Sequence, residues 1–321
     1  MWHICGVHLK NGEKKQVMIE PGVEGYEIPT TLICGKHPGK TLLVTAGIHA
    51  GEYPGIAAVK QFAEVIDPSV VQGNIILMHC VNTSGFWKRT VAILPEDGFN
   101  FNHDYPGREN GTVGERIAWY FMQEIFPKVD FILDLHSGSD TEVMIPLAFY
   151  TNAEEVKETA YRAARALDLP YLVESTATKG QYSYAAHHYK VPGLLLEIGH
   201  SHSCEKEWVE LYDRNIKLLL QHLEMASFGE EKKTKRQKVF KDAIYLSSFE
   251  QGLWYPSVKL EQRFKKGEML GKTEDFFGNP ISTYFAEADG TVLYYTNGLS
   301  VPDNSFLIAY GLEKNSEIIE G

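Results

Sequence analysis

The sequence has few cysteines, no long apolar run and no excess of basic residues. Its four cysteines are scattered without a Cys-x-x-Cys pair, a pattern that favours reduced thiols over a disulfide framework. No run of about 18 apolar residues is present, so we expect no membrane-spanning helix and no membrane partner. With 31 basic and 42 acidic side chains the formal net charge is −11, whereas nucleic-acid binding normally needs a basic surface. We therefore expect no nucleic-acid partner.

Familiar targeting and catalytic patterns are also missing. The first residues lack the charged and apolar regions of a signal peptide, so we expect a cytoplasmic protein. The His-Glu-x-x-His motif of zincins, the Gly-x-Ser-x-Gly elbow of serine hydrolases and a glycine-rich phosphate loop are all absent. The apolar fraction of 44% and the charged fraction of 23% are ordinary for a globular protein. Composition thus excludes several classes without naming a function.

Apolar runs alternate with helical patterns over the first two thirds of the chain. Buried strands are predicted at 41–46, 75–81, 131–135 and 194–198. Helices are predicted at about 56–66, 113–126, 153–168 and 205–226. Strands and helices that alternate at this spacing indicate an α/β domain with a largely parallel sheet.

Changes in composition divide the chain into three parts. Residues 1–228 form the predicted α/β domain, and its first 35 residues are a glycine-rich, β-rich lead-in. Residues 229–240 are mostly charged and read as a solvated linker, with a basic docking segment as the alternative. Residues 241–321 contain short β-rich runs separated by turns, which predicts a smaller all-β domain.

The first candidate for chemistry follows the strand at 41–46. His49 and Glu52 stand three residues apart, between that strand and the next predicted helix. Ligands of open α/β sheets bind beyond the carboxyl ends of strands, and imidazole nitrogen and carboxylate oxygen both suit Zn²⁺. A His-x-x-Glu pair is common by chance, so this pair alone indicates little.

Two further residues strengthen the zinc hypothesis. His136 ends another apolar strand, and Asp134, two residues earlier, shares its strand face and could support it from outside the ligand shell. Two His and one Glu with a position left for water describe a catalytic zinc site. Glu197 stands inside an otherwise apolar strand, and a carboxylate buried there needs a partner or a role. That role could be general base and then general acid, with a salt-bridged structural Glu as the alternative.

These motifs together resemble the succinylglutamate desuccinylase/aspartoacylase family. The segments 47–52, 134–138 and 192–199 match it in order, and the similarity covers most of residues 35–200. The resemblance implies the zinc-carboxypeptidase fold, a mixed and largely parallel sheet flanked by helices, beside a β-rich domain like the one predicted at 241–321. It also implies that His49, Glu52 and His136 bind one Zn²⁺ per chain and that Glu197 transfers protons.

The segment between the metal motifs is where this family recognises its substrate. Arg89 matches an arginine that polarises the carbonyl to be cleaved, although a surface cation in a loop is the alternative. Asn102 also matches the family pattern. His103 departs from it, because the family has there an arginine that clamps a substrate carboxylate, and a neutral His offers one donor where Arg offers a charged fork. Recognition of a substrate carboxylate is therefore in question.

We predict a zinc-dependent hydrolase that cleaves the amide C–N bond of a small N-acylated amine or amino-acid derivative. Metal-activated water would attack the carbonyl, with Glu197 as general base and acid. Two alternatives stay open: a zinc carboxypeptidase or amidase that acts on peptides or cell-wall fragments, and a non-catalytic binding protein on the same fold. The sequence is also compatible with a homo-oligomer.

Overall fold

The computed structural model describes residues 1–200, 202–229 and 236–320. Within these ranges the centre is a ten-stranded mixed sheet. In spatial order its strands are β21 (Ser316–Ile319), β12 (Gln237–Phe240), β10 (Tyr171–Ser175), β9 (Leu147–Thr151), β11 (Gly193–Glu197), β7 (Phe131–His136), β5 (His37–Ala46), β6 (Gln72–Met78), β4 (Ile28–Cys34) and β3 (Glu13–Ile19). A separate hairpin pairs β1 (Trp2–Ile4) with β2 (Val7–Leu9).

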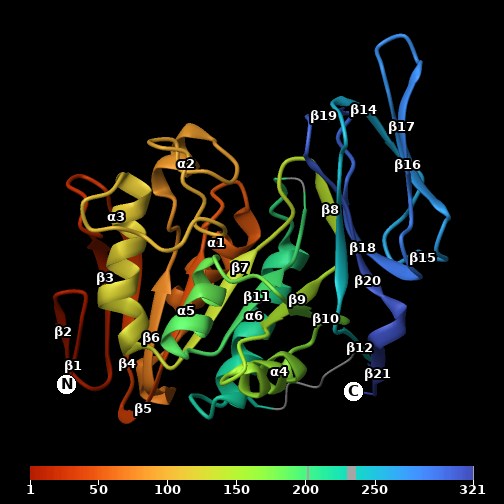
Figure 1. Ribbon diagram of the computed structural model, residues 1–321. Helices are drawn as coiled ribbons and strands as arrows, with labels where there is room; N and C mark the ends of the chain where they lie inside the picture. Colours follow the sequence, from red (N-terminus) through yellow and green to blue (C-terminus); the bar gives the residue numbers. More distant parts are fainter. Residues whose placement is uncertain (201, 230–235, 321) are drawn as a thin grey trace.

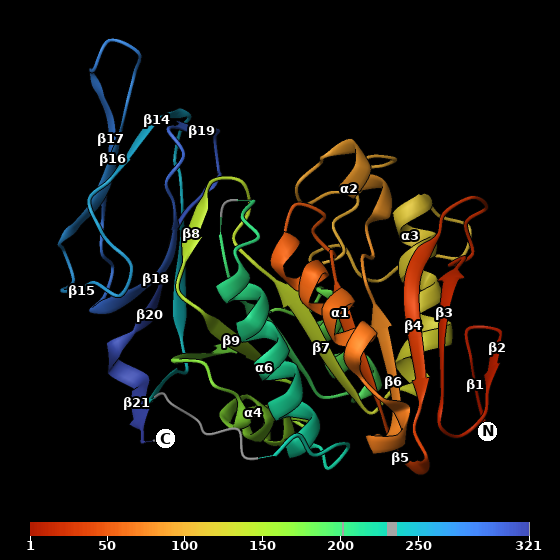
Figure 2. The same ribbon diagram turned by 180° about the vertical axis from the view of Figure 1, so that it is seen from behind.

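Helices cover both faces of this sheet. Three of them lie on the face seen in Figure 2: α1 (Tyr53–Val65), α4 (Lys157–Ala166) and α6 (Lys206–His222). The face seen in Figure 1 carries α3 (Val113–Tyr120) and α5 (Gln181–Tyr189), and α2 (Thr83–Lys88) lies above the sheet. The described residues also form four short helical segments: η1 (Pro68–Val70), η2 (Phe121–Ile125), η3 (Phe126–Lys128) and η4 (Glu313–Asn315). Among the described residues, no helix is long and apolar enough to cross a membrane.

The central strands are apolar because both of their faces are buried. In β7, Ile132 packs into the core under α3 and α5, while its neighbour Leu133 packs into the core under α1, α4 and α6. Successive side chains of a strand point to opposite faces, so a strand between two helical layers needs an unbroken apolar run. Asp134 and His136 are the polar exceptions in β7, and both are buried.

The C-terminal part is an all-β unit beside the large sheet (Figure 1). One of its sheets contains β13 (Ala243–Ser247), β20 (Phe306–Leu312), β18 (Gly290–Thr296) and β15 (Arg263–Phe264). The other contains β17 (Pro280–Phe285), β16 (Met269–Glu274), β14 (Gly252–Pro256) and β19 (Ser300–Val301). The predicted α/β fold with a smaller C-terminal β region is confirmed.

Two connections join this unit to the α/β part. β8 (Glu142–Met144) follows β7 in the chain and pairs antiparallel with β18 of the C-terminal unit. β12 and β21 add to the edge of the large sheet beyond β10. β12 lies within the range 229–240 that the sequence assigned to a linker, and residues 230–235 of that range are outside the described residues. The domain boundaries therefore stay a prediction.

Candidate metal centre and active site

The three predicted ligands meet at one edge of the large sheet. β5 and β7 are parallel neighbours, with Ala46 opposite Leu135, so both strands end at this edge. His136 is the last residue of β7, and Glu52 immediately precedes α1. The loop between β5 and α1 turns at Gly47, whose φ of +62° favours glycine and whose added Cβ would lie 2.7 Å from Cys80 Sγ. This turn carries His49 and Glu52 over the end of β7.

Glu52 lies between the two imidazoles. Its Oε1 is 2.8 Å from Nδ1 of His49, and its Oε2 is 3.0 Å from Nδ1 of His136. One candidate ligand atom from each residue lies within 4.8 Å of the other two, and no further set of this kind occurs among the described residues. Two imidazole nitrogens and a carboxylate fit the donor set of a catalytic Zn²⁺ site.

The outer nitrogen of each imidazole faces another oxygen. His49 Nε2 lies 3.0 Å from Oδ1 of Asn100, and His136 Nε2 lies 3.2 Å from Oδ2 of Asp134 in a close contact without hydrogen-bond geometry. Thr45 holds Asp134 in place by donating its hydroxyl to Oδ1 at 2.8 Å. With a proton on each Nε2, both Nδ1 atoms present lone pairs toward a common point. Such outer oxygens orient the imidazoles of metal sites.

The cluster favours an ionised Glu52. Burial raises the pKa of Glu52, but His49 and His136 outweigh it and lower that pKa to about 2. Burial likewise opposes protonation of His136, while Asp134 and Glu52 raise its pKa well above the ordinary value. Carboxylates thus dominate the local charge and create a place for a cation.

Glu197 ends β11 beside the metal candidates. Its backbone is opposite His136 in the parallel pairing of β11 with β7. Tyr212 of α6 braces both strand ends, because its hydroxyl donates to the carbonyl oxygen of His136 and accepts from the backbone N–H of Ile198 at 3.1 Å. Oε2 of Glu197 is buried with no hydrogen-bond partner among the described residues. Burial, followed by the charge of Glu52, raises the pKa of Glu197 well above its usual range.

A cavity of about 570 Å³ opens onto this cluster. The residues that line it come from both parts of the chain: His49, Glu52, Ala92, Asn100, Asn102, His103, Ser137, Ser139, Glu142, Met144, Phe149, Ser175, Thr176, Ala177, Tyr182, Leu195, Glu197, Tyr245, Tyr294 and Phe306. The last two tyrosines and Phe306 belong to the C-terminal unit. That unit therefore completes the wall of the site.

Two of the predicted substrate residues line this cavity. Asn102 and His103 follow Asn100, whose side-chain oxygen also accepts the N–H of Asn102 at 2.8 Å. Burial, followed by the neighbouring His49, lowers the pKa of His103, which favours a neutral imidazole. The sequence analysis missed Asn100 and Glu142, since neither stands at a recognisable spacing from the metal motifs.

Arg89 is placed differently. It lies exposed at the carboxyl end of α2 in a left-handed conformation, with a φ of 59°, and is not among the lining residues. The structure does not bring its guanidinium to the cavity. Its role toward the carbonyl oxygen stays a prediction.

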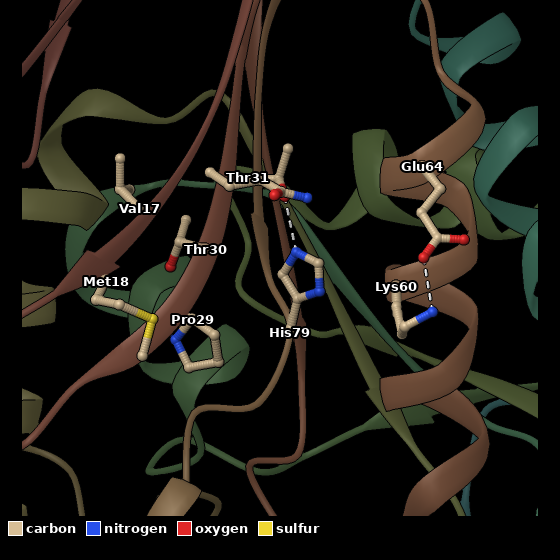
Figure 3. Close-up of a pocket in the computed structure, with 9 residues that line it drawn as sticks. Val17, Met18, Pro29, Thr30, Thr31, Lys60, Glu64 and His79 are labelled. Atoms are coloured by element: carbon tan, nitrogen blue, oxygen red, sulfur yellow. Dashed lines mark hydrogen bonds and ion pairs between the residues drawn. The ribbon is translucent and has the colours of Figure 1, made fainter.

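A second cavity of about 460 Å³ lies between α1 and the strands β3, β4 and the end of β6 (Figure 3). Its polar groups bond to each other: Thr31 Oγ1 is 2.8 Å from His79 Nε2, and Lys60 Nζ is 2.6 Å from Glu64 Oε1 (Figure 3). Because the described residues offer no cluster of metal ligands here, we place the chemistry in the first cavity.

Residues 38–223 match the catalytic domain of the succinylglutamate desuccinylase/aspartoacylase family. This chain belongs to that family. The matched range covers more than half of the chain and contains all three candidate ligands and Glu197. The resemblance drawn from the motifs is therefore confirmed.

Relatives and solved structures agree with this family assignment. The N-alpha-acetyl-L-2,4-diaminobutyric acid deacetylase of Halomonas elongata is 28% identical over 277 residues, which is 83% of this chain and 80% of that protein. The product-bound ectoine utilization protein EutE (DoeB) of Ruegeria pomeroyi superposes with a TM-score of 0.85 at 22% identity over 95% of this chain and 97% of that chain. A succinylglutamate desuccinylase/aspartoacylase of Rhodobacter sphaeroides gives a TM-score of 0.84 at 21% identity over 96% and 98%. The fold expected of the family is thus confirmed along most of the chain.

Proposed function

We propose that this protein is a zinc-dependent deacylase that hydrolyses the amide of a small N-acylated amine. The observation that carries the proposal is that His49, Glu52 and His136 bring their ligand atoms together, while His49, Glu52 and Glu197 line one cavity. The family supports deacylation, and the Halomonas relative is a deacetylase of an acylated diamino acid. We extend that kind of activity to this chain.

Zn²⁺ held by His49, Glu52 and His136 would act as a Lewis acid and lower the pKa of water to about 7. Asn100 and Asp134 keep the two imidazoles oriented toward Glu52.

Glu197 is the candidate proton carrier. Its carboxyl takes a proton from the attacking water and later delivers one to the departing amine nitrogen. A carboxyl in an enclosed site, with a pKa raised by burial, can accept and later release a proton.

The dimensions of the cavity favour a small substrate. Its volume of about 570 Å³ falls within the roughly 300–1,000 Å³ typical of small-molecule sites. The C-terminal unit also walls one side of it with Tyr245, Tyr294 and Phe306. This arrangement supports a deacylase over an enzyme with an open groove for peptides.

The test combines metal analysis with turnover. We expect about one Zn²⁺ per chain in the purified protein, and loss of that metal in His49→Ala and His136→Ala. Glu197→Gln should keep the metal and lose turnover of N-acetyl amines, because the amide has the shape of the carboxylate but cannot carry the proton. Cleavage of short peptides is measured in parallel, because it is the activity that the carboxypeptidase alternative predicts.

Two results would contradict the proposal. One is the absence of a tightly held divalent metal in protein that was purified without chelators. The other is a Glu197→Gln variant that turns over N-acetyl amines as fast as the unaltered protein. Cleavage of peptides in preference to N-acetyl amines would point instead to the carboxypeptidase alternative.

A further inference from the structure

Gln181 is a fully buried amide that the proposed hydrolysis leaves without a role. It is the first residue of α5, and its neighbour Tyr182 lines the active-site cavity. Gln181 itself reaches the large sheet, where its Nε2 donates to Oγ1 of Thr45 at 2.8 Å. Its Oε1 is buried with no hydrogen-bond partner among the described residues. An apolar side chain would avoid the cost of that buried oxygen, so the bond to Thr45 is the reason to look for a role.

This bond is the first link of a polar chain that ends at a predicted metal ligand. Thr45 and Asp134 lie opposite each other in the parallel pairing of β5 with β7. The Thr45 hydroxyl donates to Oδ1 of Asp134 at 2.8 Å, and Oδ2 of Asp134 lies 3.2 Å from Nε2 of His136. All four side chains of the chain are buried. The chain therefore connects α5 to the imidazole through two neighbouring strands.

The donors and acceptors of this chain have one consistent order. The Nε2 group of an amide only donates, an ionised carboxylate only accepts, and a hydroxyl has a single proton. When Gln181 donates to the Thr45 oxygen, the hydroxyl proton of Thr45 is directed to Asp134. With the amide turned over, Oε1 of Gln181 would compete for that proton. Gln181 therefore sets the direction in which the Thr45 hydroxyl donates.

The last link of the chain bears on metal binding. A carboxylate behind a histidine ligand fixes the orientation of the ring and the nitrogen that carries the proton. Asp134 is held at Oδ1 by Thr45 and places Oδ2 against Nε2 of His136. The Nδ1 atom of His136 then faces the ligand cluster, 3.0 Å from Oε2 of Glu52. A change at the start of the chain should thus be felt at this nitrogen.

We propose that Gln181 is a positioning residue for the metal ligand His136 and acts on it through Thr45 and Asp134. This inference rests on the proposed zinc-dependent function. It makes zinc affinity depend on a side chain of α5 that belongs neither to the candidate ligands nor to the cavity lining.

An anchoring role for Gln181 makes a different prediction. If its amide only holds α5 on the sheet, its loss lowers the melting temperature and leaves the dissociation constant for Zn²⁺ unchanged. Ser183 supplies the matched control, because it is buried in the same helical turn and its hydroxyl donates to the carbonyl oxygen of Gly180 at 3.1 Å. Ser183→Ala should lower the melting temperature without a change in zinc affinity.

The test measures the zinc dissociation constant by competition with a chromophoric chelator. Thr45→Val keeps the shape of the side chain without its hydroxyl and should weaken zinc binding by roughly tenfold, the lower end of the range for partners of histidine ligands. Gln181→Met removes the amide at similar size and should weaken it by roughly three- to tenfold, because it acts one link further away. Thr45→Ser keeps the hydroxyl and should retain the zinc affinity of the unaltered protein.

The double variant of Thr45→Val and Gln181→Met distinguishes a chain from two independent effects. Once the Thr45 hydroxyl is gone, loss of the amide has nothing further to disturb. The double variant should therefore bind zinc as weakly as Thr45→Val alone. Independent contributions would instead multiply.

Unchanged zinc affinity in Gln181→Met would overturn the proposal, as would a double variant whose loss equals the product of the single losses. Should Gln181→Met fail to fold, Gln181→Asn takes its place with the same expectation, because its amide is one carbon shorter and does not reach Thr45.

Failure of the unaltered protein to bind zinc would refute the proposed zinc-dependent function instead. The Nε2 proton of His136, observed by NMR in metal-free protein with isotope-labelled histidine, would then test the chain. Its signal should move in Gln181→Met and in Thr45→Val but not in Ser183→Ala. A signal that stays in place in Gln181→Met would overturn the proposal.

Discussion

His103 lines the cavity next to His49, and its surroundings favour the neutral imidazole. An arginine at this position would bring a charged fork that binds a carboxylate through two hydrogen bonds. We expect His103→Arg to raise kcat/KM for N-acetyl-L-aspartate by about tenfold, the effect of roughly one charged hydrogen bond. His103→Gln, which adds no charge, is the control. An unchanged kcat/KM in His103→Arg would show that carboxylate selection lies elsewhere in the cavity.

The positions of single residues could be predicted where the backbone pattern fixed their place. His49, Glu52 and His136 follow apolar strands, and parallel strands present their carboxyl ends at one edge, so their meeting followed from the sequence. Asn100 reaches His49 across 51 residues of chain through an irregular segment, for which no periodicity exists. The exposed position of Arg89 likewise depends on how α2 ends, which motif matching does not reveal.

Among the elements, the boundaries proved harder to predict than the strands and helices themselves. The helix predicted at 113–126 consists of α3, a π-helical turn over Phe121–Ile125 and a 3-10 turn, because Pro127 prevents the regular helix from continuing. β12 pairs with β10 through residues that lie 67 positions apart in sequence, so local composition predicted only a charged segment there.

One ion pair ties β12 to the C-terminal unit and makes stability depend on pH. Lys238 Nζ lies 2.5 Å from Glu313 Oε1, and Thr291 also donates to that oxygen. Burial raises the pKa of Glu313, but the hydrogen bonds from Lys238 and Thr291 and the Lys238 charge give a net lowering. A lowered folded pKa adds stability above the unfolded value of about 4.3, and that stability is lost as pH falls toward the folded pKa.

Glu313→Gln should therefore destabilise the protein by about 1 kcal/mol near pH 7. The difference in free energy of unfolding between this variant and the unaltered protein should become smaller below about pH 4.3, because the native carboxylate is then also protonated. Urea unfolding at several pH values measures this difference. Glu109→Gln, at an exposed position, is the control. A difference in free energy of unfolding that stays constant with pH in Glu313→Gln would contradict the assigned role of the ion pair.

For the molecule as a whole, metal binding should contribute to stability, because the ligands come from the β5–α1 loop and from β7. A ligand that binds only the folded state at a concentration of about 1,000 times its Kd adds roughly 4 kcal/mol. Dialysis against a chelator should thus lower the melting temperature by several degrees, and added Zn²⁺ should restore it. His136→Ala should melt at the same temperature with and without the chelator. A chelator effect of equal size in that variant would show that the metal binds elsewhere.

β8 pairs with β18 of the C-terminal sheet, and two separate stretches of the gene encode the wall of the cavity. The reactive centre depends on residues before position 200, whereas Tyr245, Tyr294 and Phe306 are encoded after it. Mutations in the later stretch can reshape which molecules are accepted while the reaction itself is conserved.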